Sequence, residues 1–314
     1  MNVGPAASGR HAPTHGQPAS LAAEPPTGLR LWLMAARPRT LTIAVAPVVA
    51  GAGLAWEHAH ALVLLPLLAA LLGAVLIQVG TNLWNDVGDA VRGGDQPMRQ
   101  GPPRVTALGW ATPERVRVAA TLCFAAAGMV GLYLAWVGGW PIVALGLASL
   151  VAGWAYSGGP RPIAYTPLGE AFVLAFFGLG AVGGTVWLQL GRLPPEAISV
   201  GLAIGLPACA VLMANNYRDL EADRLVGRRT LAILLGADGA KAAYAGMILA
   251  PFVVLMSPVA PDGAWVALAA APMAVRLVLA FATTTRGPAF NRILAATARF
   301  QLVLAALAAL GCLL

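Results

Sequence analysis

Residues 62–89 read LVLLPLLAALLGAVLIQVGTNLWNDVGD, an apolar run that ends in a cluster of asparagine and aspartate. No charged residue occurs in this stretch before Asp86. As a helix, residues 62–85 are long enough to cross a hydrocarbon layer roughly 30 Å thick. The stretch therefore predicts a transmembrane helix whose polar end lies at a membrane surface.

Similar apolar runs fill most of the remaining chain, near 40–56, 116–136, 140–156, 168–190, 198–217, 240–257, 263–282 and 293–313. The 314 residues are 59% hydrophobic and 11% charged, which excludes a soluble protein with a single core. We expect an all-α, polytopic membrane bundle of about nine transmembrane helices. Residues 30–314 are predicted to form this domain, and residues 1–29 a disordered N-terminal tail.

The basic residues are distributed unevenly among the predicted loops. Only Arg192 falls in an outer loop, whereas Arg276 and Arg299 lie inside predicted helices. This asymmetry is the positive-inside pattern, and it accounts for the net charge of +7 without a nucleic-acid partner. It predicts a cytoplasmic N-terminus, cytoplasmic cap loops after the second and sixth helices, and a C-terminus outside.

The polar cluster of the first run recurs 133 positions later, with Asn215 and Asp219 matching Asn82 and Asp86. Helical spacing places three residues of each copy on one face. These are Asn82, Asp86 and Asp89 in the first motif, and Asn215, Asp219 and Asp223 in the second. Each copy closes a predicted helix, so both are expected at the same membrane surface, in or beside connections near 86–115 and 218–239.

Carboxylates at the ends of membrane helices usually mark function, because burying them without a partner is costly. Magnesium prefers oxygen ligands and often bridges carboxylates to phosphate oxygens. Asp86, Asp89, Asp219 and Asp223 are thus predicted to hold Mg²⁺ and a diphosphate between them. For one motif alone, a helix end paired with a nearby arginine explains the aspartates equally well. The duplication favours the metal site.

Further side chains near the two motifs are predicted to bind substrate. Arg92, Asp95, Arg99 and Arg104 interleave with glycine and proline after the first motif, an arrangement that favours a binding lid. Tyr156 is predicted either to shape an aromatic pocket or to lie in an interfacial belt. Glu170 either acts on an acceptor or caps a helix end. The full set of substrate-binding candidates is Asn82, Asn85, Asp95, Arg92, Arg99, Arg104, Arg161, Asn215, Arg228, Arg229 and Tyr156.

From Trp32 onward the chain resembles the UbiA superfamily of intramembrane aromatic prenyltransferases. The resemblance rests on several stretches: AARPRTL at 35–41, NDVGDAVRGGD at 85–95, YSGGP at 156–160, LGE at 168–170, NNYRDLEAD at 215–223 and GRRTL at 227–231. The third aspartate of the first motif, Asp95, follows Asp89 by six residues. That spacing is similar to the 1,4-dihydroxy-2-naphthoate polyprenyltransferase branch, which serves menaquinone biosynthesis.

The resemblance implies a Mg²⁺-dependent enzyme of the bacterial inner membrane. It would transfer a polyprenyl group from polyprenyl diphosphate to 1,4-dihydroxy-2-naphthoate, with loss of carbon dioxide and diphosphate, giving demethylmenaquinol. Under the resemblance the four aspartates coordinate the metal and Asp95 supports the first loop.

Three alternatives remain open from the sequence. A related enzyme could use 4-hydroxybenzoate or another aromatic acceptor. A secondary transporter would bind ions and substrate near the bilayer midplane, whereas these acidic residues lie at helix ends. Another membrane phosphotransferase would also use aspartates and magnesium, but the twin motif fits it less well.

Overall fold

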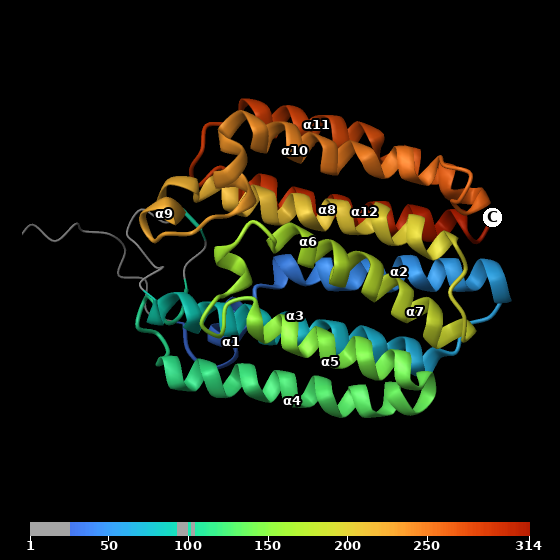
Figure 1. The fold of residues 1–314 in the computed structure, drawn as a ribbon, viewed down its shortest axis with the longest axis horizontal. Helices are drawn as coiled ribbons and strands as arrows, with labels where there is room; N and C mark the ends of the chain where they lie inside the picture. Colours follow the sequence, from blue (N-terminus) through green and yellow to red (C-terminus); the bar gives the residue numbers. More distant parts are fainter. Residues whose placement is uncertain (1–25, 93–99, 102–103) are drawn as a thin grey trace, which may run out of the picture.

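The computed structural model describes residues 26–92, 100–101 and 104–314, and these contain helices and no strand. The elements run in chain order as α1 (Gly28–Ala36), α2 (Pro38–Ala59), α3 (Leu64–Val91), α4 (Pro113–Gly138), α5 (Trp140–Ala155), η1 (Ile163–Tyr165), α6 (Gly169–Val173), η2 (Leu174–Gly180), α7 (Ala181–Leu190), α8 (Glu196–Arg218), α9 (Leu220–Leu225), α10 (Leu231–Leu255), η3 (Asp262–Ala270), α11 (Ala271–Thr283) and α12 (Phe290–Gly311). Figure 1 shows the long helices packed side by side in one bundle.

The predicted transmembrane segments correspond closely to these helices. Within the described residues, eight helical stretches are long and apolar enough to cross a membrane, with α6, η2 and α7 forming one of them. The ninth predicted segment, 140–156, becomes α5, which has only 16 residues. At about 1.5 Å per residue this helix is roughly 24 Å long, shorter than a typical hydrocarbon layer. The all-helical membrane fold is confirmed.

The predicted end of the second helix was wrong. We placed that end at residue 85, but α3 continues through Gly88 to Val91. Asp86 and Asp89 therefore lie within the last turns of a helix rather than in the connection that follows it. The predicted tail ended at residue 29, but α1 begins at Gly28, so the last two residues of that segment are helical. Expectations for residues 1–25 lie outside the described residues.

Helix α8 lies at the centre of the bundle, and 78% of its most apolar 18-residue stretch is buried. It packs on η2, α10 and α12, and with α10 and α12 it shares one large cluster of buried apolar side chains. A Cβ atom at Gly205 of α8 would lie 2.8 Å from the Cα atom of Gly178 in η2. The two glycines thus allow the backbones of α8 and η2 to approach closely. This central helix carries the second acidic motif at its C-terminal end.

The segment Leu174–Gly180, η2, is a π-helical interruption within the span Gly169–Leu190. Such interruptions widen a helix locally and often occur at functional sites. Phe176 and Gly180 of this segment line a cavity of about 650 Å³. The interruption is therefore part of a cavity wall.

Candidate functional site

Both acidic motifs lie at the end of the bundle where α3 and α8 finish. Figure 1 shows α9 and the part of the α3–α4 connection that leads into α4 at this end, and the C-terminus at the other. Asp86 and Asp89 are each 1% exposed, and Asp219 and Asp223 are 5% and 6% exposed. The bundle thus gathers four nearly buried carboxylates at one end.

Asp86 is held by the chain that returns toward α4. Its carboxylate accepts backbone N–H bonds from Val105 (3.2 Å) and Thr106 (3.3 Å) and a third bond from the Thr106 hydroxyl. Asp86 therefore anchors the chain after the predicted lid to the end of α3.

The one turn of α3 that holds both aspartates packs tightly on the turn after α5. A Cβ atom at Gly88 would lie 2.7 Å from the Ser157 carbonyl oxygen. The Arg92 guanidinium donates to that same carbonyl at 2.5 Å and to the Gly159 carbonyl at 2.8 Å. Gly88 is therefore a close-packing residue within a helix, and Arg92 fastens α3 to this turn.

One guanidinium joins the two motifs. Arg228 Nη2 lies 2.6 Å from Asp89 Oδ1, and Arg228 Nη1 lies 3.0 Å from Asp223 Oδ1. Burial alone would lower the pKa of Arg228, but the neighbouring carboxylates of Asp89 and Asp223 raise it above its ordinary value. Arg104 forms a second ion pair with Asp89. These two arginines neutralise the carboxylates that the sequence assigns to a metal.

The helix is interrupted within the second motif, whereas α3 continues unbroken through the first. Helix α8 ends at Arg218, Asp219 occupies the junction, and Asp223 lies on the short helix α9. The Arg218 guanidinium contacts Asp219 and donates to the side-chain oxygens of Asn215 (2.9 Å) and Asn291 (2.7 Å). Asp219 also accepts a bond from the Gln100 backbone N–H at 3.1 Å. Asp219 is thus held by Arg218 and by the backbone of Gln100, whereas Asp223 is held by Arg228.

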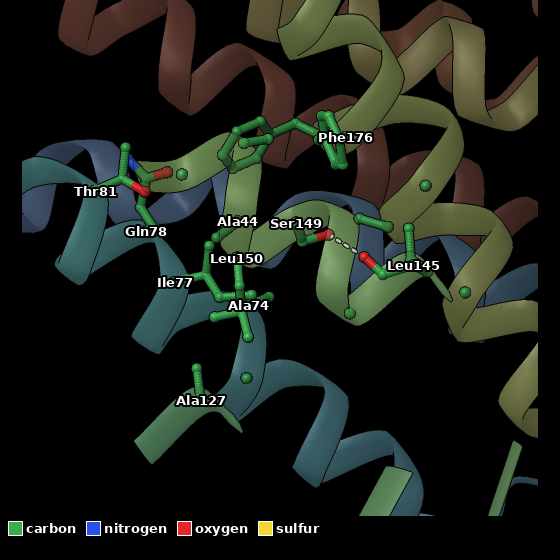
Figure 2. Close-up of a pocket in the computed structure, with 18 of the residues that line it drawn as sticks. Ala44, Ala74, Ile77, Gln78, Thr81, Ala127, Leu145, Ser149, Leu150 and Phe176 are labelled. Atoms are coloured by element: carbon green, nitrogen blue, oxygen red, sulfur yellow. Dashed lines mark hydrogen bonds between the residues drawn. The ribbon is translucent and has the colours of Figure 1, made fainter. Parts of the chain in front are cut away.

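A cavity of about 650 Å³ runs from this end into the bundle. Beside the two motifs its lining is polar, from Arg37, Asn82, Asn85, Tyr156 and Asn215, and the mainly apolar remainder also includes Thr40, Gln78, Thr81, Ser149 and Thr185. Figure 2 shows part of its apolar wall, with Ala74 and Ile77 of α3, Leu145 and Leu150 of α5, and Phe176 of η2. The cavity therefore joins a polar mouth to an apolar interior.

A second, smaller cavity of about 330 Å³ lies beside Asp219 and Arg218. Glu221 and Arg286, which also line it, form an ion pair of 3.2 Å between α9 and the α11–α12 loop. Asp219 thus lines this smaller cavity rather than the large one among the described residues.

The remaining predicted site residues do not all lie beside the aspartates. Asn82 donates to the Ala36 carbonyl at 2.9 Å and so ties α3 to the end of α1. Arg161 and Arg229 are exposed, and within the described part of the chain no ion pair joins their side chains to the aspartates. Asp95 and Arg99 lie outside the described residues.

Several residues of the site were not among the predicted ones. Arg37 adopts a left-handed backbone conformation between α1 and α2 (φ 56°) and lines the mouth of the cavity. Desolvation, with a contribution from nearby Arg104, lowers its pKa to about 10, so it stays charged at neutral pH. Its place in the stretch AARPRTL was the only sequence signal for it. Arg218 and Thr106 had no signal beyond their closeness to the motifs.

Glu170 does not match either of its two predicted roles, action on an acceptor or capping of a helix end, on its own. It is 5% exposed, lies in the first turn of α6 and accepts a bond from Asn216 at 3.2 Å. Tyr156 lies nearby, and burial together with the Glu170 carboxylate raises the pKa of Tyr156. Glu170 thus links the start of α6 to the second motif of α8.

The donor set suits a hard divalent cation, because it consists of carboxylate oxygens next to amide oxygens. Among the described residues, however, no three acidic, histidine or cysteine side chains already converge on one point. Asp89 and Asp223 approach one another through Arg228 instead. A metal ion therefore fits this end only if arginine side chains move from carboxylate to a bound anion.

Comparison with known proteins agrees with this architecture. Residues 44–303 match the model of the UbiA prenyltransferase family. The chain is similar to a 1,4-dihydroxy-2-naphthoate octaprenyltransferase of Mycobacterium tuberculosis, with 38% identity over 78% of this chain and 84% of the relative. An enzyme of the same name from Escherichia coli is 37% identical over 78% of this chain and 82% of the relative.

The fold is also similar to a solved structure of a UbiA homolog from Archaeoglobus fulgidus bound to GPP and Mg²⁺. The TM-score is 0.60 at 15% identity, and the match covers 90% of this chain and 99% of that one. The family match spans most of the chain, including both acidic motifs and most of the residues that line the large cavity. The chain is a membrane prenyltransferase that belongs to the UbiA family.

Proposed function

We propose that the chain transfers a polyprenyl group from polyprenyl diphosphate to 1,4-dihydroxy-2-naphthoate, releasing diphosphate and carbon dioxide and giving demethylmenaquinol. The observation that carries the proposal is the continuity between a polar mouth beside four buried aspartates and an apolar cavity. The names of relatives at 37–38% identity support the naphthoate as acceptor.

The diphosphate is proposed to lie between the two motifs. Asp86, Asp89, Asp219 and Asp223 would hold Mg²⁺, as the Mg²⁺ in the solved archaeal homolog supports. The bound metal supplies neutralisation of charge on the leaving diphosphate. Arg228 and Arg104 would turn from Asp89 to the phosphate oxygens, since a guanidinium binds phosphate as well as carboxylate. Arg37, charged at the mouth, would add a third cation.

The prenyl chain is proposed to fill the apolar part of the cavity. The side chains that line it from α3, α5 and η2 offer few polar groups and so exclude water from the allylic carbon. The Tyr156 hydroxyl at the mouth stays protonated because burial raises its pKa, so it can donate to the acceptor. The allylic C–O bond would break, with its electron pair leaving on the diphosphate, and the ring carbon bearing the carboxylate would bond to the allylic carbon. The bond from that ring carbon to the carboxylate would then break, so that carbon dioxide leaves and the electron pair of the broken bond restores the aromatic ring.

The proposed site lies at the cytoplasmic side of a bacterial inner membrane, with the C-terminus outside. The basic residues near the acidic end support this orientation through the positive-inside rule. A cysteine placed at exposed Arg161 should react with a membrane-impermeant maleimide only in inverted vesicles. Labelling of intact cells would reverse the orientation.

The direct test uses purified protein with Mg²⁺, polyprenyl diphosphate and either 1,4-dihydroxy-2-naphthoate or 4-hydroxybenzoate, with products identified by mass. We expect prenylation of the naphthoate with loss of carbon dioxide. Asp86→Ala and Asp219→Ala should abolish it, while Asp238→Ala, at a fully exposed side chain, should not. Prenylation of hydroxybenzoate alone would reassign the acceptor, and substrate flux in liposomes without any product would favour a transporter.

A further inference from the structure

Three arginines on the outer faces of α11 and α12 have no role in the site described above. Arg276 lies on α11, and Arg292 and Arg299 lie on α12; all three are exposed. The two helices contact one another in the bundle. Among the described residues, no ion pair or hydrogen bond is formed by the side chains of Arg276 and Arg292. We call these three exposed residues, which lie on two helices in contact, the outer arginine surface.

Two of the arginines lie within the membrane-spanning part of their helices. Arg276 is seven residues before the end of α11, and Arg299 is nine residues after the start of α12. At about 1.5 Å per residue, these positions are roughly 10 Å and 14 Å from the acidic end of the bundle. Their exposed neighbours are apolar: Val275 and Leu279 are 51% and 59% exposed, and Val303 is 41% exposed. The cations therefore interrupt surfaces that otherwise suit lipid.

On α12 the two arginines lie on the same face, because they are seven residues apart. The Arg299 Nε donates to the Ala295 carbonyl at 3.3 Å, so the side chain folds back along the helix toward Arg292. This is the direction of the acidic end, where the headgroups of that leaflet would lie. The fold-back is the snorkelling geometry that carries a long cationic side chain toward a polar layer.

A charged residue at this depth is costly unless an anion meets it. Phospholipid phosphates lie at the depth that snorkelling arginines reach, and basic surfaces of membrane helices bind anionic lipids. We infer that the outer arginine surface binds the headgroup of an anionic phospholipid in the leaflet of the acidic motifs.

The inference is tested by native mass spectrometry of the full-length protein titrated with phosphatidylglycerol or phosphatidylcholine. Wild-type protein should retain phosphatidylglycerol in preference to phosphatidylcholine by about tenfold or more, as two cations near a lipid phosphate favour. The double variant Arg276→Leu/Arg299→Leu should lose that preference. Leucine fits a lipid-facing apolar surface, so the variant should fold, and its melting temperature in neutral lipid provides the check.

A matched control removes two arginines from another part of the same end. Arg115 and Arg117 are exposed in the first turns of α4, so Arg115→Leu/Arg117→Leu removes equal charge away from α11 and α12. This control should keep most of the phosphatidylglycerol preference. Equal loss in both double variants, or equal retention of the two lipids by wild type, would overturn the inference. If the wild-type protein is a dimer that dissociates in Arg276→Leu/Arg299→Leu, the partner of this surface is a second copy of the chain and not a lipid. If inorganic phosphate displaces the lipid, the ligand is a free anion.

Discussion

The two acidic motifs share a spacing in sequence but differ in backbone and in partners. Asp86 and Asp89 lie on the unbroken end of α3, whereas Asp219 and Asp223 lie on either side of the junction between α8 and α9. Asp86 of the first motif is held by backbone N–H groups of the following chain, whereas Asp89 and both aspartates of the second motif pair with arginine side chains. The repeated pattern thus marks one wall with a carboxylate anchored by backbone groups, which we call the rigid wall, and one wall whose carboxylates are held by side chains.

Removing the bridge between the motifs should have the largest effect. Arg228→Met leaves the Asp223 carboxylate without its 3.0 Å partner and removes one of two cations from Asp89. Breaking a buried ion pair costs about 3 kcal/mol, and the variant also loses a proposed phosphate ligand. We expect prenylation to fall by roughly 100-fold or more and the melting temperature to fall as well.

Added Mg²⁺ distinguishes the loss of the ion-pair bridge from the loss of a proposed phosphate ligand in Arg228→Met. If the motifs hold the metal, Mg²⁺ should raise the melting temperature of Arg228→Met more than that of wild type, because the metal no longer competes with Arg228. Equal shifts of the melting temperature in the two proteins would show that Arg228 does not compete with a metal ion for these carboxylates. Arg224→Met, which removes an exposed pair with Glu221, serves as the control.

Substitution within the rigid wall should have the next largest effect. In Gly88→Ala the new Cβ atom would meet backbone at the Ser157 carbonyl, so α3 must shift from the turn after α5. We expect a loss of about 1–3 kcal/mol in unfolding free energy and a lower kcat, both measured in the same detergent. Gly131→Ala, where a Cβ atom meets nothing within 4 Å, should be nearly neutral. Equal effects would mean that Gly88 acts through helix propensity alone.

A smaller effect should follow from changing one ligand of Asp86. Thr106→Val keeps the shape of the side chain and removes only its hydroxyl bond to the Asp86 carboxylate. We expect about 1–2 kcal/mol less stability by chemical denaturation and a loss of several-fold in activity. Because two backbone bonds remain, Mg²⁺ dependence should be retained. A complete loss of Mg²⁺ dependence would make the Thr106 hydroxyl part of the metal site.

The smallest effect is expected at Arg161. Its side chain is exposed and, among the described residues, forms no ion pair with either motif. Arg161→Ala should change kcat/KM by less than about threefold and stability by less than about 0.5 kcal/mol. A loss comparable to that of Arg228→Met would show that Arg161 moves to the diphosphate on binding.

Hydropathy and motif spacing predicted the membrane-helical fold, because a long apolar run has few structures available in a bilayer. They also located the two motifs at helix ends that meet at one end of the bundle. The extension of α3 to Val91 was missed because Gly88 is a weak helix former in isolation, and its role depends on the distant Ser157 carbonyl.

The pairing of residues was harder to predict than their presence. That Arg228 bridges Asp89 and Asp223 depends on how α3, α9 and the following turn meet in space. Local sequence also could not separate Arg228 from adjacent Arg229, since one points into the site and the other is exposed. Tertiary contact, not composition, distinguishes the two.

The shortness of α5 has a consequence for the membrane itself. This 16-residue helix lines the large cavity through Leu145 and Leu150, yet it lies beside the longer helices α3 and α4. Hydrophobic mismatch at a short helix is relieved by local thinning of the bilayer. We therefore expect the acyl-chain length of the surrounding lipid to act on the wall of the large cavity, which would make bilayer thickness a variable of the proposed reaction.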